Sequence, residues 1–164
     1  MAVDMFLTIE DGKIKGESKD KKNKDAIDVL SWNWGLSQTG TMHGGGGGGA
    51  GKVNVQDLTI TKYVDRASPD LMLSMCQGTH YKNAKLTVRK AGGAEPLPYL
   101  IITLEKVLVS SMTSGGSGGD ERLVETISLN FAVVKVQYQP QKEDGTKDGG
   151  VVEMAWDVAA NDKA

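Results

Sequence analysis

Val53-Asn-Val-Gln-Asp-Leu-Thr-Ile-Thr-Lys-Tyr63 opens the stretch of sequence that decides the fold. This segment is dense in β-branched and aromatic residues, and Leu58 and Ile60 share one face, so it predicts a β-strand. A short helix and a returning strand, clearest at Leu86–Arg89, complete a strand–helix–strand unit that ends at Lys90. A short amphipathic helix is not stable alone in water, so this one needs a sheet to pack against.

The predicted helix, near Ser68–Gly78, has clear signals at both ends. Ser68-Pro69-Asp70 combines a side-chain N-cap, a proline at the first helical position and an acid in the first turn. Gly78 supplies the expected stop. Apolar residues at helical spacing predict the face that meets the sheet, and they are Leu71, Met72, Met75 and Cys76. Cys76, the only cysteine, is therefore expected to be buried and inert, and it excludes an internal disulfide.

Composition narrows the class of protein. A chain of 164 residues is long enough for a real core, and we expect one domain over residues 1–164. The net charge of −2 gives no reason to expect a nucleic acid or an anionic membrane as partner. No run of apolar residues is long enough for a membrane span. Met1–Phe6 has no signal-peptide pattern, so we expect cytoplasmic synthesis and, if the protein is secreted, a route without a cleaved signal peptide.

Outside the central unit, alternating apolar residues predict further strands, with turn signals such as Asp11-Gly12 between them. Tyr99–Val109 is apolar on both faces and should be an interior strand. Leu123–Tyr138 should be the longest strand, with a bulge or a second buried face near Ala132. The remaining strands are expected at Val3–Ile9, Ala26–Leu36 and Val152–Val158.

About eight strands and one helix predict an antiparallel β-barrel, made of two packed sheets, with the short helix on its side. Several strands are apolar on both faces, which is more than one small barrel can bury. Association of several copies is the economical explanation.

The tryptophans indicate which faces are buried. On the Ala26–Leu36 strand, Trp32 and Trp34 point to one side and Ser31 and Asn33 to the other. We expect the indoles, with Trp156 on the last strand, to face the core or a seam between subunits. The small polar side chains should then face away from the core.

Two loops stand out. Ser18–Asp25 is rich in lysine with interspersed acids, and we interpret it as a solvated loop rather than a binding patch. Gln38–Gly51 is long and contains six consecutive glycines, Gly44–Gly49. Loops of this length in compact domains are usually functional or disordered.

No catalytic or cofactor site emerges from the sequence. The segment Gly46–Lys52 approximates a phosphate-binding loop, but Val53 replaces the required hydroxyl residue and a strand follows instead of a helix. His43 and His80 have no partners at metal or triad spacing. Because no nucleophile, base and orienting group can be named together, we expect neither an enzyme nor a metal or cofactor site. Aromatic residues are too few for a base-stacking surface.

The whole chain resembles the haemolysin-coregulated protein (Hcp) family, the inner-tube subunits of bacterial type VI secretion systems. Six segments carry the resemblance most specifically: Ile27–Gly35, Gly49–Leu58, Thr61–Tyr63, Tyr99–Leu104, Leu129–Ala132 and Tyr138–Lys142. The resemblance implies a β-barrel with a side helix, assembled as a hexameric ring with a wide channel. It also implies that the rings stack into a tube. A contractile sheath would enclose this tube, and a VgrG-type spike would lie at its tip. The subunit would be secreted itself and would carry small effector proteins in the lumen.

Within this picture, we expect Ser31 and Asn33 to face the channel, because an apolar wall would hold unfolded cargo too tightly. The glycine-rich loop is the candidate contact between stacked rings, ordering on contact at an entropic cost. Its residues are Met42, His43, Gly44, Gly45, Gly46, Gly47, Gly48 and Gly49. The alternative is a small-ligand-binding β-barrel, monomeric or dimeric, with an internal apolar pocket and no ring.

Overall fold

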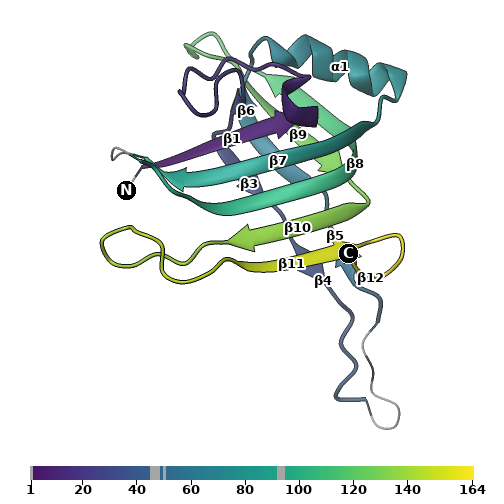
Figure 1. The fold of residues 1–164 in the computed structure, drawn as a ribbon. Helices are drawn as coiled ribbons and strands as arrows, with labels where there is room; N and C mark the ends of the chain where they lie inside the picture. The colour runs from purple at the N-terminus through teal and green to yellow at the C-terminus, as the bar shows by residue number, and fades with distance from the viewer. Residues whose placement is uncertain (1, 45–48, 50, 92–94) are drawn as a thin grey trace.

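The computed structural model describes residues 2–44, 49, 51–91 and 95–164 (Figure 1). These residues are mainly β, with one α-helix, as predicted, and the strand pairs among them are antiparallel. The strands are β1 (Val3–Ile9), β2 (Ile27–Asp28), β3 (Ser31–Asn33), β4 (Leu36–Ser37), β5 (Asn54–Val55), β6 (Leu58–Tyr63), β7 (Tyr81–Lys90), β8 (Pro98–Gly115), β9 (Val124–Asn130), β10 (Val133–Tyr138), β11 (Val152–Asp157) and β12 (Asp162–Lys163). The helix is α1 (Ala67–Gln77), and a 3-10 turn, η1 (Glu10–Gly12), follows β1.

The strands form two sheets that share β8. The first sheet runs β12-β11-β10-β8-β7-β1-β2, and the second runs β8-β9-β6-β3. Strands β4 and β5 pair with each other, and residues 38–44 lead away from the two sheets (Figure 1).

Strand β8 joins the sheets because it changes partners along its length. Its first half pairs with β7 on one side and β10 on the other, which confirms the predicted interior strand. From Leu108 onward it pairs with β9. Lys106 has a positive φ of 55°, and the register with β9 shifts between Val109 and Ser111. Such irregularities bend a strand, which lets the two halves of β8 enter different sheets.

The core lies between the facing sides of the two sheets. Leu58 and Ile60 of β6 are fully buried, as their alternation predicts. The same cluster draws on β1, β7, β8 and β9 through Leu7, Ile9, Leu86, Ile102, Leu104, Ile127 and Leu129.

Helix α1 ends where the sequence predicts. Gly78 has a left-handed φ of 64°, a conformation that glycine adopts at little cost. At the other end the prediction is wrong in detail: the helix begins at Ala67, and Ser68 is not its N-cap. The N-cap position is Arg66, and Asp65, one residue earlier, accepts a hydrogen bond at its Oδ1 from the Ala67 N–H at 2.9 Å.

The predicted buried face of α1 is also wrong. Of the expected stripe only Leu71 is buried, whereas Met72, Met75 and Cys76 are exposed. The other buried positions are the small residues Ala67, Ser68 and Ser74. Small side chains let the helix lie close to the sheet, and the hydroxyls of Ser68 and Ser74 find partners there.

Two strand predictions need correction. Leu123–Tyr138 is not one strand, because the chain leaves β9 of the second sheet and enters β10 of the first at Phe131 and Ala132. The change of parity near Ala132 therefore marks a crossing between sheets, and β8, with 18 residues, is the longest strand described. The expected Ala26–Leu36 strand is divided into β2, β3 and β4.

Candidate functional site: the polar face of the second sheet

The outer side of the second sheet carries small polar side chains in register across four strands. One cross-strand row is Ser31, Thr61, Thr126 and Thr113, and the next is Asn33, Thr59, Ser128 and Ser111. We call these eight residues the polar face. All of them are half-buried or exposed, and none is ionisable.

The residues between these rows point the other way. Trp32 is paired with Ile60, Ile60 with Ile127, and Ile127 with Met112, and all four pack in or against the core. Side chains alternate strictly along a strand, so burial of one set exposes the other. The structure thus brings Ser31 and Asn33 onto one surface with six further polar residues.

The sequence alone did not point to these six residues. Thr59 and Thr61 alternate with Leu58 and Ile60, and the same pattern holds in β9. This alternation was a usable signal for an outward polar face. What the sequence could not provide was the pairing order β3-β6-β9-β8, which aligns the rows.

A hydrogen bond joins two strands within the polar face, and charged groups lie at both of its ends. Across β6 and β9, the hydroxyls of Thr59 and Ser128 are 3.0 Å apart. At one end, Asp57 accepts hydrogen bonds from Ser110 at 2.6 Å and Asn130 at 2.8 Å.

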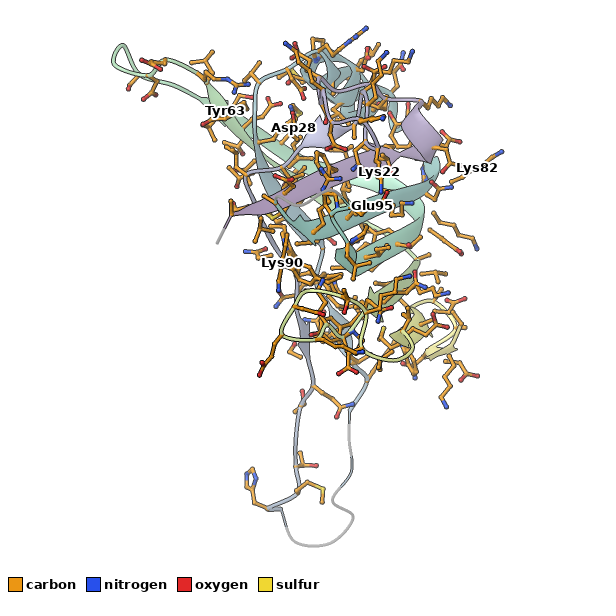
Figure 2. The ribbon with its side chains drawn as sticks, turned by 60° about the vertical axis from the view of Figure 1, so that its left-hand side comes forward. Lys22, Asp28, Tyr63, Lys82, Lys90 and Glu95 are labelled. Atoms are coloured by element: carbon orange, nitrogen blue, oxygen red, sulfur yellow. The ribbon has the colours of Figure 1, made fainter. Side chains whose placement is uncertain are left out.

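At the opposite end, the Arg122 guanidinium lies 3.8 Å from the centre of the Tyr63 ring, which Figure 2 labels. Charged groups therefore lie at the ends of the face, while its middle is neutral and hydroxyl-rich. Such a surface offers many weak hydrogen bonds and no strong apolar or ionic anchor.

A buried ionic cluster lies behind the polar face. The Lys62 ammonium on β6 is fully buried and contacts Glu125 of β9 at 2.5 Å and Asp65 at 2.7 Å. It also donates to the Ser68 hydroxyl on α1 at 3.1 Å. Burial opposes ionisation of Glu125, but the Lys62 ammonium and the Ser68 and Ser114 hydroxyls outweigh it and lower the Glu125 pKa. The cluster fastens α1 to the two central strands of the sheet.

The three tryptophans are partly buried and pack against the core. Trp34 donates from Nε1 to the Gln56 carbonyl at 2.9 Å and lies 6.5 Å from the Phe131 ring, centre to centre. Trp156 borders a pocket of about 330 Å³ between β11 and the base of the β4–β5 segment. Its Nε1 is buried and has no hydrogen-bond partner among the described residues.

The candidate ring-stacking loop is described only in part. Met42 is 84% exposed and His43 is exposed, and the Thr41 hydroxyl donates to the Gly49 carbonyl at 2.9 Å. Gly45–Gly48 lie outside the described residues.

In the described part of the chain, no three His, Cys, Asp or Glu residues are grouped so that they could hold a metal ion. The helix in that part is too short to cross a membrane.

The chain is similar to known proteins over its whole length. A family model described as "Type VI secretion system effector, Hcp" matches residues 6–138, and the chain belongs to this Hcp family. The chain is 61% identical over 164 residues, all of both chains, to "Protein hcp1" of Pseudomonas aeruginosa.

Solved structures agree with this assignment. The chain is 39% identical to Hcp1 from Salmonella typhimurium, with a TM-score of 0.80 and all of both chains covered. It is 32% identical to a structure described as a type six secretion system protein, with a TM-score of 0.91, covering 99% of this chain and all of the other. A type VI secretion system effector from Yersinia pestis gives 32% identity and a TM-score of 0.75, covering 94% of this chain and 99% of the other. These matches confirm the family predicted from the sequence.

Proposed function

We propose that this chain is the structural subunit of a type VI secretion tube, a homohexameric ring whose channel is lined by the polar face. The observation that supports the proposal most directly is that the second sheet has two free edges. Among the described residues, β3 pairs only with β6, and β8 beyond Val107 pairs only with β9, so both edges of this sheet are free. Unpaired edges are natural sites for association, and six copies arranged edge to edge would extend the polar face around a channel.

We also infer that each subunit is a closed barrel. Between β2 and β3, the Val29 N–H donates to the Met5 carbonyl at 3.0 Å and the Leu30 N–H donates to the Thr61 carbonyl at 2.7 Å. These bonds support a continuous circuit from β1 through this segment to β6. Closure leaves few open edges within one subunit, so the remaining ones are available for neighbours.

The chemistry of the polar face suits a passage for proteins. An apolar wall would bind exposed hydrophobic segments of cargo, and a strongly charged wall would select cargo by net charge. Hydroxyls and one amide exchange hydrogen bonds with cargo and water at little net gain. Small effector proteins are therefore the lumen partners we propose, with Ser31 and Asn33 among the residues that face them.

Three further assignments follow the family. The segment around Met42 and His43 extends from the sheets and is our candidate contact between stacked rings. Trp32, Trp34 and Trp156 complete the core or a subunit seam. The contractile sheath and a VgrG-type spike are the proposed outer and terminal partners, and the subunit is itself secreted.

Native mass spectrometry with negative-stain imaging of the same sample tests this proposal. A mass of six subunits and annular particles with an open centre are expected. A monomer or dimer without rings at high concentration would instead favour the small-ligand-binding barrel. In a second experiment, Asn33→Arg should reduce effector protection by the ring, with Lys142→Arg as the charge-conserving control. Unchanged protection would refute the role of Asn33.

A further inference from the structure

A second surface, on the other sheet, has the features of an anion site. The loop that follows η1 crosses the outer side of β1 and β7 and leaves a pocket of about 410 Å³. Four lysines line it: Lys15, Lys22 and Lys24 from the loop, and Lys85 from β7. Asp11 and Asp25 line it too, which leaves a formal excess of two positive charges.

The loop is fixed rather than loosely solvated. Backbone hydrogen bonds run from the Gly16 N–H to the Asp25 carbonyl at 2.8 Å, from Ser18 to Ala26 at 3.0 Å, and from Asp25 to Ser18 at 3.0 Å. Gly16 lies so close to Ala26 that an added Cβ would be 2.4 Å from the Ala26 carbonyl oxygen. The lysines are thus carried on a pre-formed frame, which lowers the entropic cost of binding.

Two further acids of this loop, Asp20 and Glu17, are held by other groups. Asp20 accepts from the Arg89 guanidinium and from the Lys22 and Asn23 N–H groups. Although partial burial opposes ionisation, these hydrogen bonds lower the Asp20 pKa to about 2. Glu17 accepts from the Arg66 N–H at 3.1 Å, toward the start of α1. Neither carboxylate is therefore directed at the pocket lysines.

The lysines themselves have few counterions. Within the described residues, Lys15, Lys24 and Lys85 make no ion pair. Lys22 lies 3.4 Å from Glu95 in an exposed pair, in front of β1 and β7 (Figure 2), and such pairs exchange readily with solvent.

The wall of the pocket supplies a further donor. Thr87 of β7 is only 8% exposed and lines the pocket. Thr8, which also lines the pocket, is directly opposite Lys85 in the β1–β7 register. Both threonine side chains carry hydroxyl groups, which can donate a hydrogen bond to an anion.

We propose that this pocket binds a phosphate-bearing anion. Lysine ammoniums bind phosphoryl oxygens as point charges, and a hydroxyl completes the coordination as a hydrogen-bond donor. The concave shape favours a compact anion over an extended acidic peptide, and the volume is in the range of small-molecule pockets. The site lies on the sheet opposite the polar face and does not depend on ring assembly.

Isothermal titration calorimetry on the full chain tests the proposal, with inorganic phosphate and AMP as separate probes at low salt. Both are expected to bind, because they share the phosphoryl group. Tighter binding of AMP would assign the site to a phosphomonoester, and equal binding would assign it to the free anion. Lys85→Met should weaken binding about tenfold, the value of one charge-assisted hydrogen bond. Thr87→Val should weaken it several-fold.

The matched control is Lys142→Met, which removes an exposed lysine on the turn between β10 and β11. This control is expected to bind as the parent does. The proposal is overturned if neither probe binds, if Lys142→Met weakens binding as much as Lys85→Met, or if an acidic peptide binds where phosphate does not. If thermal unfolding shows that Thr87→Val does not fold, Lys85→Met decides the outcome, because its side chain is exposed.

Discussion

Glu125→Gln should destabilise the protein strongly, because it leaves the buried Lys62 ammonium without its nearest counterion. Both side chains are fully buried, and their charged atoms are 2.5 Å apart. Removing one partner of a buried pair costs about 3–5 kcal/mol, since the other charge remains desolvated. Asp65, at 2.7 Å from the ammonium, retains part of the compensation, so we expect the lower end, about 3 kcal/mol.

Thermal unfolding at one fixed protein concentration measures the effect, because any association of subunits shifts the midpoint. For a chain of this size, about 3 kcal/mol corresponds to a fall in Tm of roughly 6–12 °C. The control is Lys135→Gln, which breaks an exposed pair with Glu153 at 3.4 Å and should cost less than about 1 kcal/mol.

The double variant Lys62→Met/Glu125→Leu separates charge from packing. It removes the Lys62–Glu125 pair and leaves Asp65 without the ammonium, so it should recover part of the stability that either single change loses. If Glu125→Gln changes Tm no more than Lys135→Gln does, the cluster is not a desolvated ion pair and the reasoning is refuted.

Lowering the pH should weaken the same Lys62–Glu125 ion pair and destabilise the protein. The Glu125 pKa is below its ordinary value in the folded state, so its stabilising contribution is present above the unfolded pKa of 4.5. That contribution is lost as the pH falls through the folded pKa. The parent should therefore lose more stability than Glu125→Gln between pH 5 and the acid limit of folding, which denaturant unfolding at each pH would measure.

Other single changes test separate parts of the structure. Gly16→Ala should cost about 1–3 kcal/mol in denaturant unfolding, because the new Cβ meets the Ala26 carbonyl; an unchanged midpoint would contradict the fixed loop. Gly78→Ala should cost about 1 kcal/mol, since the left-handed φ of 64° strains alanine, and equal stability would place the helix end elsewhere. Cys76 should react with a maleimide in the folded protein as fast as in denaturant, whereas protection would restore the buried interpretation.

The sequence predicts the structure best where a local pattern is typical of only one kind of structure. The alternation of Leu58 and Ile60 predicts their burial, and Gly78 predicts the end of the helix. The face of α1 was less certain because Leu71, Met72 and Leu73 are consecutive apolar residues. Packing against the sheet then selects Leu71 with small neighbours, and tertiary contacts override the apolar pattern.

The features that the sequence does not predict depend on pairing between residues that are far apart in the chain. The change of parity near Ala132 is visible in the sequence, but its cause is not, because the cause lies in the partners of β9 and β10. A buried Lys62 is equally invisible, since lysine is usually exposed and its counterion is 63 residues away at Glu125. Ser31 and Asn33 were selected by parity in β3, and their position on a channel wall stays a prediction.

Sharing β8 between two sheets has a mechanical consequence. An 18-residue strand is up to about 60 Å long, and it pairs with β7 and β10 over its first half and with β9 over its second. The two sheets are therefore joined by one continuous stretch of backbone, which passes load from one sheet to the other. In the proposed tube, β8 would carry load between the two sheets of each subunit.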